Sequence, residues 1–365
     1  TFGRGFYVLD DYAPLREIAR GVLAEAGGVM PVRDAWWYIP NAPNQAVGRP
    51  TLGSTAYAAP NPDFGATLTY HVPAVPQTSR EAREATEEGL RTRGGDTPFP
   101  GYDVLRAEAA ESGASVWLEI ADATGAPVRR IAGTARAGVH RIAWDLRHPA
   151  PNPISLSQPG FRPPWVTDPT GPLVAPGTYS AQLVMVTADG VQTLGEAQSF
   201  AVRPVPTAPP GTDFVAVADF QYRTSELTRR VGAASSELGR VRDQLGYMRF
   251  ALERTPNADA ALTTRIDGIA NELSALSLRL NGDPVRGSLN ESSVPTISNR
   301  VGNVRNGHWS TRMNPTETQR RNIEIAESDL VGLEQDLATL IDGELAAVEQ
   351  ALVDAGAPWT PRRSR

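Results

Sequence analysis

The sequence predicts a multidomain β + α protein, in which an immunoglobulin-like β-sandwich is followed by an antiparallel three-helix bundle. Between residues 64 and 205, several strand-length segments alternate apolar and polar residues or are continuously apolar. Beyond residue 213, apolar residues recur instead at alternating steps of four and three, which is the spacing of a helix seam. Proline is frequent before residue 210 and rare after it, so the change of regime falls between these two regions.

The chain opens with TFGRGFYVLDD, and Phe6–Asp10 has the length and composition of a β-strand. Pro14 ends this pattern, because proline cannot donate a ladder hydrogen bond. No hairpin partner follows nearby, so we expect residues 1–12 to be the last strand of a sheet that begins upstream of this chain. Phe6, Tyr7 and Val8 are candidate partner contacts, since an unpaired strand edge is a template for strand addition.

Residues 13–63 are expected to form a Pro-rich extended arm. A short helix within Leu15–Ala26 would end at the glycines that follow it, and the later prolines prevent any long regular element. The aromatic anchors of the arm are Trp36, Trp37 and Tyr38. These rings would either pack on the next domain or form a partner-facing patch, and the sequence leaves both interpretations open.

The β-sandwich is expected at residues 64–205, with two loop insertions. Its predicted strands are Gly65–Val72, Ser115–Asp122, Gly138–Leu146, Gly177–Val186 and Ala197–Pro204. Gly125 and Gly190 supply positive-φ positions for hairpin turns between them. Residues 76–112 contain a charged, helix-prone stretch followed by a Pro/Gly loop, and residues 148–172 are so rich in proline that an extended path is expected.

A linker at 206–212 precedes the bundle, which is expected at 213–355 and is followed by a C-terminal tail at 356–365. Apolar seams run through Phe220–Leu252, Leu262–Leu280 and Ile323–Val348, and each of them needs the others to bury its stripe. The second connection, residues 281–315, is long for a bundle loop, and such loops are usually functional. It contains the exposed-looking pair His308 and Trp309, which we consider a candidate binding pair.

No catalytic, cofactor-binding or metal-ligating pattern is found in the sequence. There is no cysteine, every basic residue is arginine, and the four histidines do not form an HExxH-type motif. The net charge of −6 argues against a nucleic-acid protein, and no apolar stretch has the length of a membrane span. We therefore expect a chain that is not an enzyme and that carries no cofactor or metal.

Motifs along the chain resemble the C-terminal region of bacterial secreted sortilin-like, BNR-repeat β-propeller proteins, which are often labelled glycosyl hydrolases. The family pattern GRGxxxLDDxxPLR is matched by Gly3–Asp11 and Pro14–Arg16, and NPxxGA by Asn61, Pro62, Gly65 and Ala66. The pattern aGxxRxxWDLR is matched by Ala137, Gly138, Arg141 and Trp144–Arg147, and GPxVxPGtY by Gly171, Pro172, Val174 and Pro176–Tyr179. The ending AGAPWTPRR, residues 355–363, also resembles the family. The resemblance implies that residues 1–12 are the last strand of a missing β-propeller. The propeller would carry any sialidase-type site, and no Asp-box occurs in this chain.

The function that these observations favour is a non-catalytic structural or protein-interaction module of a secreted or periplasmic bacterial protein. It would dock extrinsically on other protein subunits of a larger assembly, such as a membrane complex, or on its own missing propeller. The candidate partner-binding residues are Phe6, Tyr7, Val8, Trp36, Trp37, Tyr38, His308 and Trp309. The alternative is an accessory carbohydrate-binding region of a sialidase-like propeller protein, for which Trp117, Trp165 or Trp309 would have to form an exposed flat platform.

Overall fold

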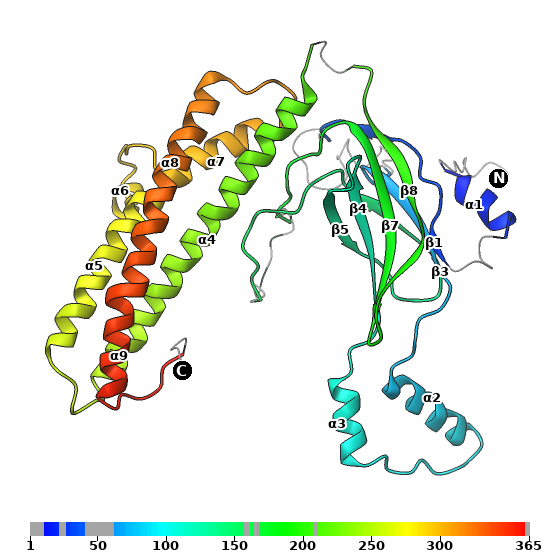
Figure 1. Ribbon diagram of the computed structural model, residues 1–365, viewed down its shortest axis with the longest axis horizontal. Coiled ribbons are helices and arrows are strands. Elements are labelled where there is room, and N and C mark those ends of the chain that lie inside the picture. The colour runs from blue at the N-terminus through cyan, green and yellow to red at the C-terminus, as the bar shows by residue number, and fades with distance from the viewer. Residues whose placement is uncertain are drawn as a thin grey trace, which may run out of the picture. The chain divides into compact units, whose positions relative to one another are not determined.

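The computed structural model describes residues 11–21, 27–40, 62–156, 161, 163, 166, 168–207 and 211–361. The chain divides into two compact units, one formed by residues 1–149 and 174–209 and the other by residues 150–173 and 210–365. The first is built mainly from β-strands and the second from helices (Figure 1). The predicted order, a β-rich part followed by a helical part, is confirmed. Residues 150–173, which the sequence places as an insertion in the β region, belong to the helical unit.

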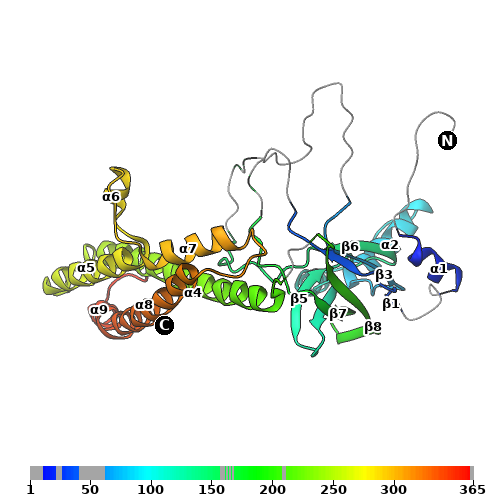
Figure 2. The same ribbon diagram turned by 90° about the horizontal axis from the view of Figure 1, so that it is seen from above.

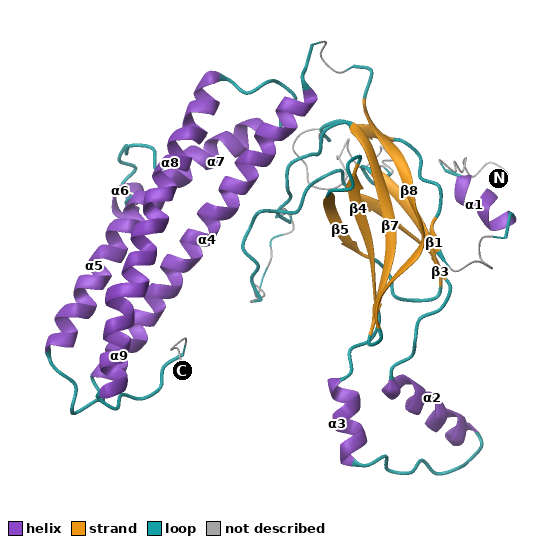
Figure 3. Cartoon of the chain, in the orientation of Figure 1, coloured by secondary structure: helices purple, strands orange, loops and turns teal. Residues whose placement is uncertain are grey.

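The β unit contains two sheets (Figure 3). The three-stranded sheet is antiparallel and has the order β1 (Gly28–Val29), β3 (Ala66–Val72), β6 (Gly138–Trp144). The five-stranded sheet has the order β2 (Ala35–Trp37), β8 (Gly190–Pro204), β7 (Gly177–Thr187), β4 (Ser115–Asp122), β5 (Pro127–Ala132). In it β2 runs parallel to β8, and the other pairs are antiparallel.

The two sheets share an apolar core, as the period-two patterns predict. On β4 the buried residues are Val116, Leu118 and Ile120, which alternate with partly exposed ones. Trp144, at the end of β6 in one sheet, packs edge-on against Tyr179 of β7 in the other, with ring centroids 5.3 Å apart. The five strands predicted between residues 65 and 204 are present, and the strand predicted at Phe6–Asp10 lies outside the described residues. The sequence did not predict β5 or the very short β1 and β2.

Between β3 and β4 the β unit contains a helical hairpin, which is formed by α2 (Ser79–Thr92) and α3 (Tyr102–Ala110). Thr78 begins α2 with a capping box that it shares with Glu81. Because α2 buries none of its residues, the hairpin has no apolar core of its own. Arg83 joins the helices through two hydrogen bonds to the Glu108 carboxylate, at 2.7 and 2.8 Å.

Further helices complete the structure (Figure 2). The β unit also contains α1 (Ala13–Ala19), and the helical unit contains α4 (Phe214–Leu252), α5 (Ala261–Asn281), α6 (Pro284–Ser288), α7 (Ile297–His308), α8 (Glu317–Leu340), the π-helical turn η3 (Ile341–Leu345) and α9 (Ala346–Asp354). One apolar core joins α4, α5, α7, α8 and α9. The residues of the predicted seams are buried in it, except Val231 and Leu252, which are partly buried and pack against it. The sequence predicts three helices in this core, but a further helix, α7, contributes Ile297, Val301 and Val304 to it. The sequence predicts a loop at residues 281–315, and the structure contains α7 within this segment.

Candidate functional site

A groove of about 650 Å³ lies in the β unit, where the edge strand β2 approaches β3. We call it the β2–β3 groove. It combines exposed aromatic side chains with a charged rim, and arm residues form much of its wall. The residues that line it are Asp11, Arg33, Asp34, Ala35, Trp36, Tyr38, Pro62, Asp63, Phe64, Gly65, Thr67 and Arg141.

The alternation of side chains along β2 decides which arm anchors face this groove. Trp37 is 3% exposed, and its Nε1 donates a hydrogen bond to the Val174 carbonyl oxygen at 2.7 Å. Trp36 points to the opposite side of the strand and is 54% exposed. Tyr38 is 39% exposed and packs edge-on against Phe64, with ring centroids 4.8 Å apart. Trp36 and Tyr38 thus form the aromatic part of the groove together with Phe64, whereas Trp37 anchors the strand.

Asp34 holds β2 in place and is itself a lining residue. Its Oδ1 accepts a hydrogen bond from the Ala201 N–H at 3.0 Å, and its Oδ2 pairs with Arg203 at 2.7 Å. Both partners belong to β8, so this carboxylate fixes the parallel pairing of β2 with β8. Arg141 on β6 and Asp63 before β3 are exposed and place charges of opposite sign at the rim.

His308, predicted as a partner-binding residue, is 1% exposed, and that expectation is wrong for its side chain. Gln221 of α4 donates a hydrogen bond from Nε2 to the His308 carbonyl oxygen at 2.9 Å and lies 3.3 Å from Nδ1. Nε2 of His308 lies 3.1 Å from the Met313 carbonyl oxygen, so the proton is assigned to Nε2 and Nδ1 accepts. Burial lowers the pKa of His308, which keeps the imidazole neutral. This residue ties the end of α7 to α4.

The remaining predicted residues have varied surroundings. Phe6, Tyr7 and Val8 lie outside the described residues, as does Trp165. Trp309 is half-buried, and within the part of the chain that the structure describes its Nε1 has no hydrogen-bond partner.

Trp117 is also half-buried. Its Nε1 donates to Ser115 Oγ at 3.0 Å, and the Arg130 guanidinium lies 5.9 Å from the centre of its ring. Neither Trp117 nor Trp309 is the open flat platform that the carbohydrate alternative requires.

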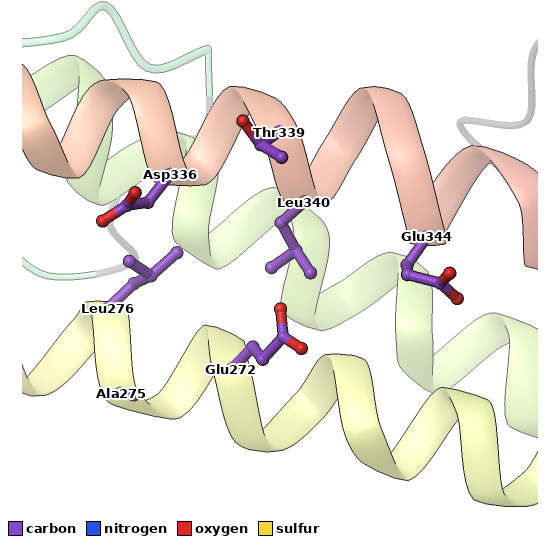
Figure 4. Close-up of a pocket in the computed structure, with 7 residues that line it drawn as sticks. All are labelled: Glu272, Ala275, Leu276, Asp336, Thr339, Leu340 and Glu344. Carbon is purple, nitrogen blue, oxygen red and sulfur yellow. The ribbon is translucent and has the colours of Figure 1, made fainter.

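A second hollow, of about 380 Å³, lies in the helical unit between α5 and the α8–η3 region (Figure 4). Its carboxylates are Glu272, Asp336 and Glu344, and Leu276 and Leu340 lie among them. Asp336 pairs with Arg279 at 2.5 Å and Glu344 pairs with Arg265 at 3.1 Å. Because two of its carboxylates belong to ion pairs on the surface, this hollow resembles a solvated helix face more than a binding site.

Sequence reasoning found Trp36 and Tyr38 but missed the rest of the groove. The pattern of β6 places Arg141 on an outward face, yet only the pairing of β2 with β8 brings the arm beside it. The Asp34 contact to Ala201 joins residues that are 167 positions apart, and no local signal reports such a contact.

No family model, no curated protein and no solved structure matches this chain. Within the described ranges, no helix is both long enough and apolar enough to cross a membrane. Over the same residues, no group of three or more His, Asp or Glu side chains is placed to hold a metal ion. The function must therefore be argued from the chemistry of the groove.

Proposed function

We propose that this chain is a non-catalytic protein-interaction module that docks on a larger protein assembly through the β2–β3 groove. The observation that carries the proposal is the exposure of Trp36 and Tyr38 beside a hollow, while their neighbour Trp37 is buried. Exposed tryptophan and tyrosine are the residue types that dominate interface energetics. A ring of charged residues around them matches the polar rim of a protein interface.

The chemistry of the groove favours binding over turnover. Among the described residues that line it there is no histidine, serine or cysteine, so the one aliphatic hydroxyl among them, that of Thr67, has no lining histidine to act as its base. Asp34 is held in place by its ion pair with Arg203, and this arrangement suits a structural carboxylate. Asp63 and Arg141 are also exposed, and their charges suit contacts with a partner surface.

An immunoglobulin-like assignment of the β unit is part of the proposal. It is supported by the packing of a three-stranded on a five-stranded sheet and by the tyrosine at the start of β7. The hydroxyl of Tyr179 donates to the Ala175 carbonyl oxygen at 2.7 Å, the contact that defines a tyrosine corner. For the helical unit we propose a three-helix bundle of α4, α5 and α8–α9, to which α7 is added.

The proposal also retains an extracytoplasmic location and a relationship to sortilin-like, BNR-repeat proteins. Support for both comes from the sequence motifs alone, such as the WDLR segment that ends β6. In this view the partner is either another subunit of an assembly or the propeller of the same protein. The groove would then be an interface between a propeller-type partner and an immunoglobulin-like unit.

Affinity purification from the native source tests this function. We would compare the wild-type chain with the Trp36→Ala/Tyr38→Ala variant and with the Phe99→Ala/Tyr102→Ala variant. The last is a matched control, because Phe99 and Tyr102 form an exposed aromatic pair in the α2–α3 hairpin. We expect one stoichiometric partner that the groove variant loses and the control retains. Recovery of all three proteins as free monomers would overturn the proposal.

Carbohydrate binding is the second candidate, and the exposed ring of Trp36 favours it. A flat tryptophan face beside Arg141 and Asp63 could stack on a sugar ring while the charged groups contact its hydroxyls. Affinity electrophoresis in gels that contain polysaccharides separates the two candidates. Retardation of the wild-type chain that is lost in Trp36→Ala would support the carbohydrate candidate over the protein partner.

A further inference from the structure

A short proline-containing segment lies against α4 in the helical unit. Residues 150–173 follow β6 in the sequence, yet they belong to the helical unit. At Gly232 of α4, an added β-carbon would lie only 3.0 Å from Cδ and 3.1 Å from Cγ of Pro153. The pyrrolidine ring of Pro153 therefore occupies the space that a side chain at position 232 would fill.

A glycine at this position of α4 needs a reason, because glycine destabilises the interior of a helix relative to alanine. Gly239 lies seven residues further along α4, and an added β-carbon there would meet nothing within 4 Å. A distant segment of the chain therefore approaches Gly232 but not Gly239. A close approach of backbone or ring is one of the reasons for which a helix keeps a glycine.

The contact of this segment with α4 is limited to a few residues around Pro153. Pro151 is buried, and Pro153 faces Gly232 on one side while it is exposed on the other. Ile154 and Leu156, which follow, are 94% and 96% exposed. Beside Pro153 lies a hollow of about 290 Å³, whose other walls come from α4, α7 and the end of α5. Its polar lining residues include Asn152, Thr228, Ser235, Asn281, Ser298 and Arg305.

We propose that residues 150–153 are a strap that clasps α4 through the Pro153–Gly232 contact and closes one side of this hollow. The chain enters the helical unit between residues 149 and 150, so the strap docks on α4 directly after this point and within the helical unit. Proline suits the role, because its fixed φ leaves little conformational entropy to be lost on docking. Tethering within one chain keeps such a small contact formed, because the effective concentration of a tethered segment is high.

Disulfide trapping tests the strap directly. The natural chain has no cysteine, so an introduced pair has no competing thiol. We would oxidise the Pro153→Cys/Gly232→Cys variant under mild conditions and compare it with Pro153→Cys/Gly239→Cys. Disulfides form between β-carbons about 3.5–4.5 Å apart. The Cγ atom bonded to the Pro153 β-carbon lies 3.1 Å from a β-carbon added at position 232, whereas no such approach exists at position 239. We expect the first pair to form its disulfide at least about tenfold faster than the second, because only position 232 lies beside residue 153 and its two thiols therefore meet at the higher effective concentration. Equal rates, or no disulfide in either variant, would overturn the proposal.

A second measurement keeps Pro153 intact. Gly232→Ala and Gly239→Ala each replace a helix glycine by the best helix former, so both variants should fold. Only Gly232→Ala places a methyl group against the proline ring. We expect Gly239→Ala to raise the midpoint of thermal unfolding of the helical unit, as a better helix former should, and Gly232→Ala to lose that gain because its methyl group meets the Pro153 ring. An equal rise in both variants would contradict a clasp at Gly232.

Discussion

Trp36 and Trp37 are neighbours in β2 and face opposite sides of the strand, so that one ring is largely exposed and the other is buried. The buried ring donates a hydrogen bond to the Val174 carbonyl oxygen, which lies 137 residues away in the sequence. The exposed ring lies in the β2–β3 groove. One dipeptide therefore both anchors the arm to the β unit and places an exposed aromatic ring in the β2–β3 groove.

The first prediction separates these two roles. Trp37→Ala should lower the free energy of unfolding of the β unit by about 3–5 kcal/mol, because it removes a large buried ring. Trp36→Ala should change it by less than about 0.5 kcal/mol, as is usual for exposed positions. Urea denaturation with a probe in the β unit measures both values. Equal destabilisation by the two substitutions would contradict the assigned orientations.

The second prediction concerns the helical core. Leu245→Ala should cost about 2–5 kcal/mol, because the side chain is buried in the core that α4 shares with the other helices. Tyr247→Ala, two residues later on the exposed side of α4, is the matched control and should change stability by less than about 0.5 kcal/mol. Thermal unfolding of the helical unit followed by circular dichroism distinguishes these outcomes.

The third prediction is a dependence of stability on pH that arises from His308. Burial lowers the pKa of His308 in the folded chain, and it outweighs the hydrogen bond to the Met313 carbonyl oxygen, which acts in the opposite direction. The unfolded chain therefore binds a proton at a higher pH than the folded chain does, so stability falls as the pH drops below about 6.5.

A His308→Gln variant should remove this contribution. Its free energy of unfolding should change less between pH 7.5 and 5.5 than that of the wild-type chain, whatever its absolute stability. His148, whose pKa is lowered by burial and by Arg129, stays in both proteins and cancels in the comparison. An unchanged slope in the variant would show that His308 does not titrate as proposed.

The fourth prediction concerns the α2–α3 hairpin, where the ion pair between Arg83 and Glu108 replaces an apolar core. The hydrogen bonds from Arg83 lower the pKa of Glu108, so the link should persist at neutral pH and weaken as acid protonates the carboxylate. Arg83→Gln should speed amide hydrogen exchange in α3. Arg106→Gln, which breaks an exposed pair within α3, should leave that exchange nearly unchanged and serves as the control.

Periodicity explains how much of the fold could be predicted from the sequence. The alternation in β3, β4, β6 and β7 reports burial directly, and so do the seams of α4, α5 and α8, because each pattern is set by the local geometry of its element. The segment that holds α7 is rich in Asn and Gly, which obscured the spacing of Ile297, Val301 and Val304.

The parts that could not be predicted depend on contacts between distant residues. His308 is near Asn and Gly in sequence and seemed exposed, but Gln221, 87 residues earlier, covers it. The parallel pairing of β2 with β8 likewise depends on Asp34 and on strands far along the chain. The groove follows from this pairing, and so only its aromatic residues could be named in advance.

The central claim is that the β2–β3 groove binds a protein partner, and site-specific photo-crosslinking tests it most directly. A benzophenone amino acid would replace Trp36 in one variant and Tyr102, a still more exposed aromatic residue of α3, in another. Both chains would be irradiated in the native source and their adducts identified by mass spectrometry. We predict one discrete protein adduct from position 36 and none from position 102; no adduct at position 36, or the same adducts from both positions, would contradict the claim.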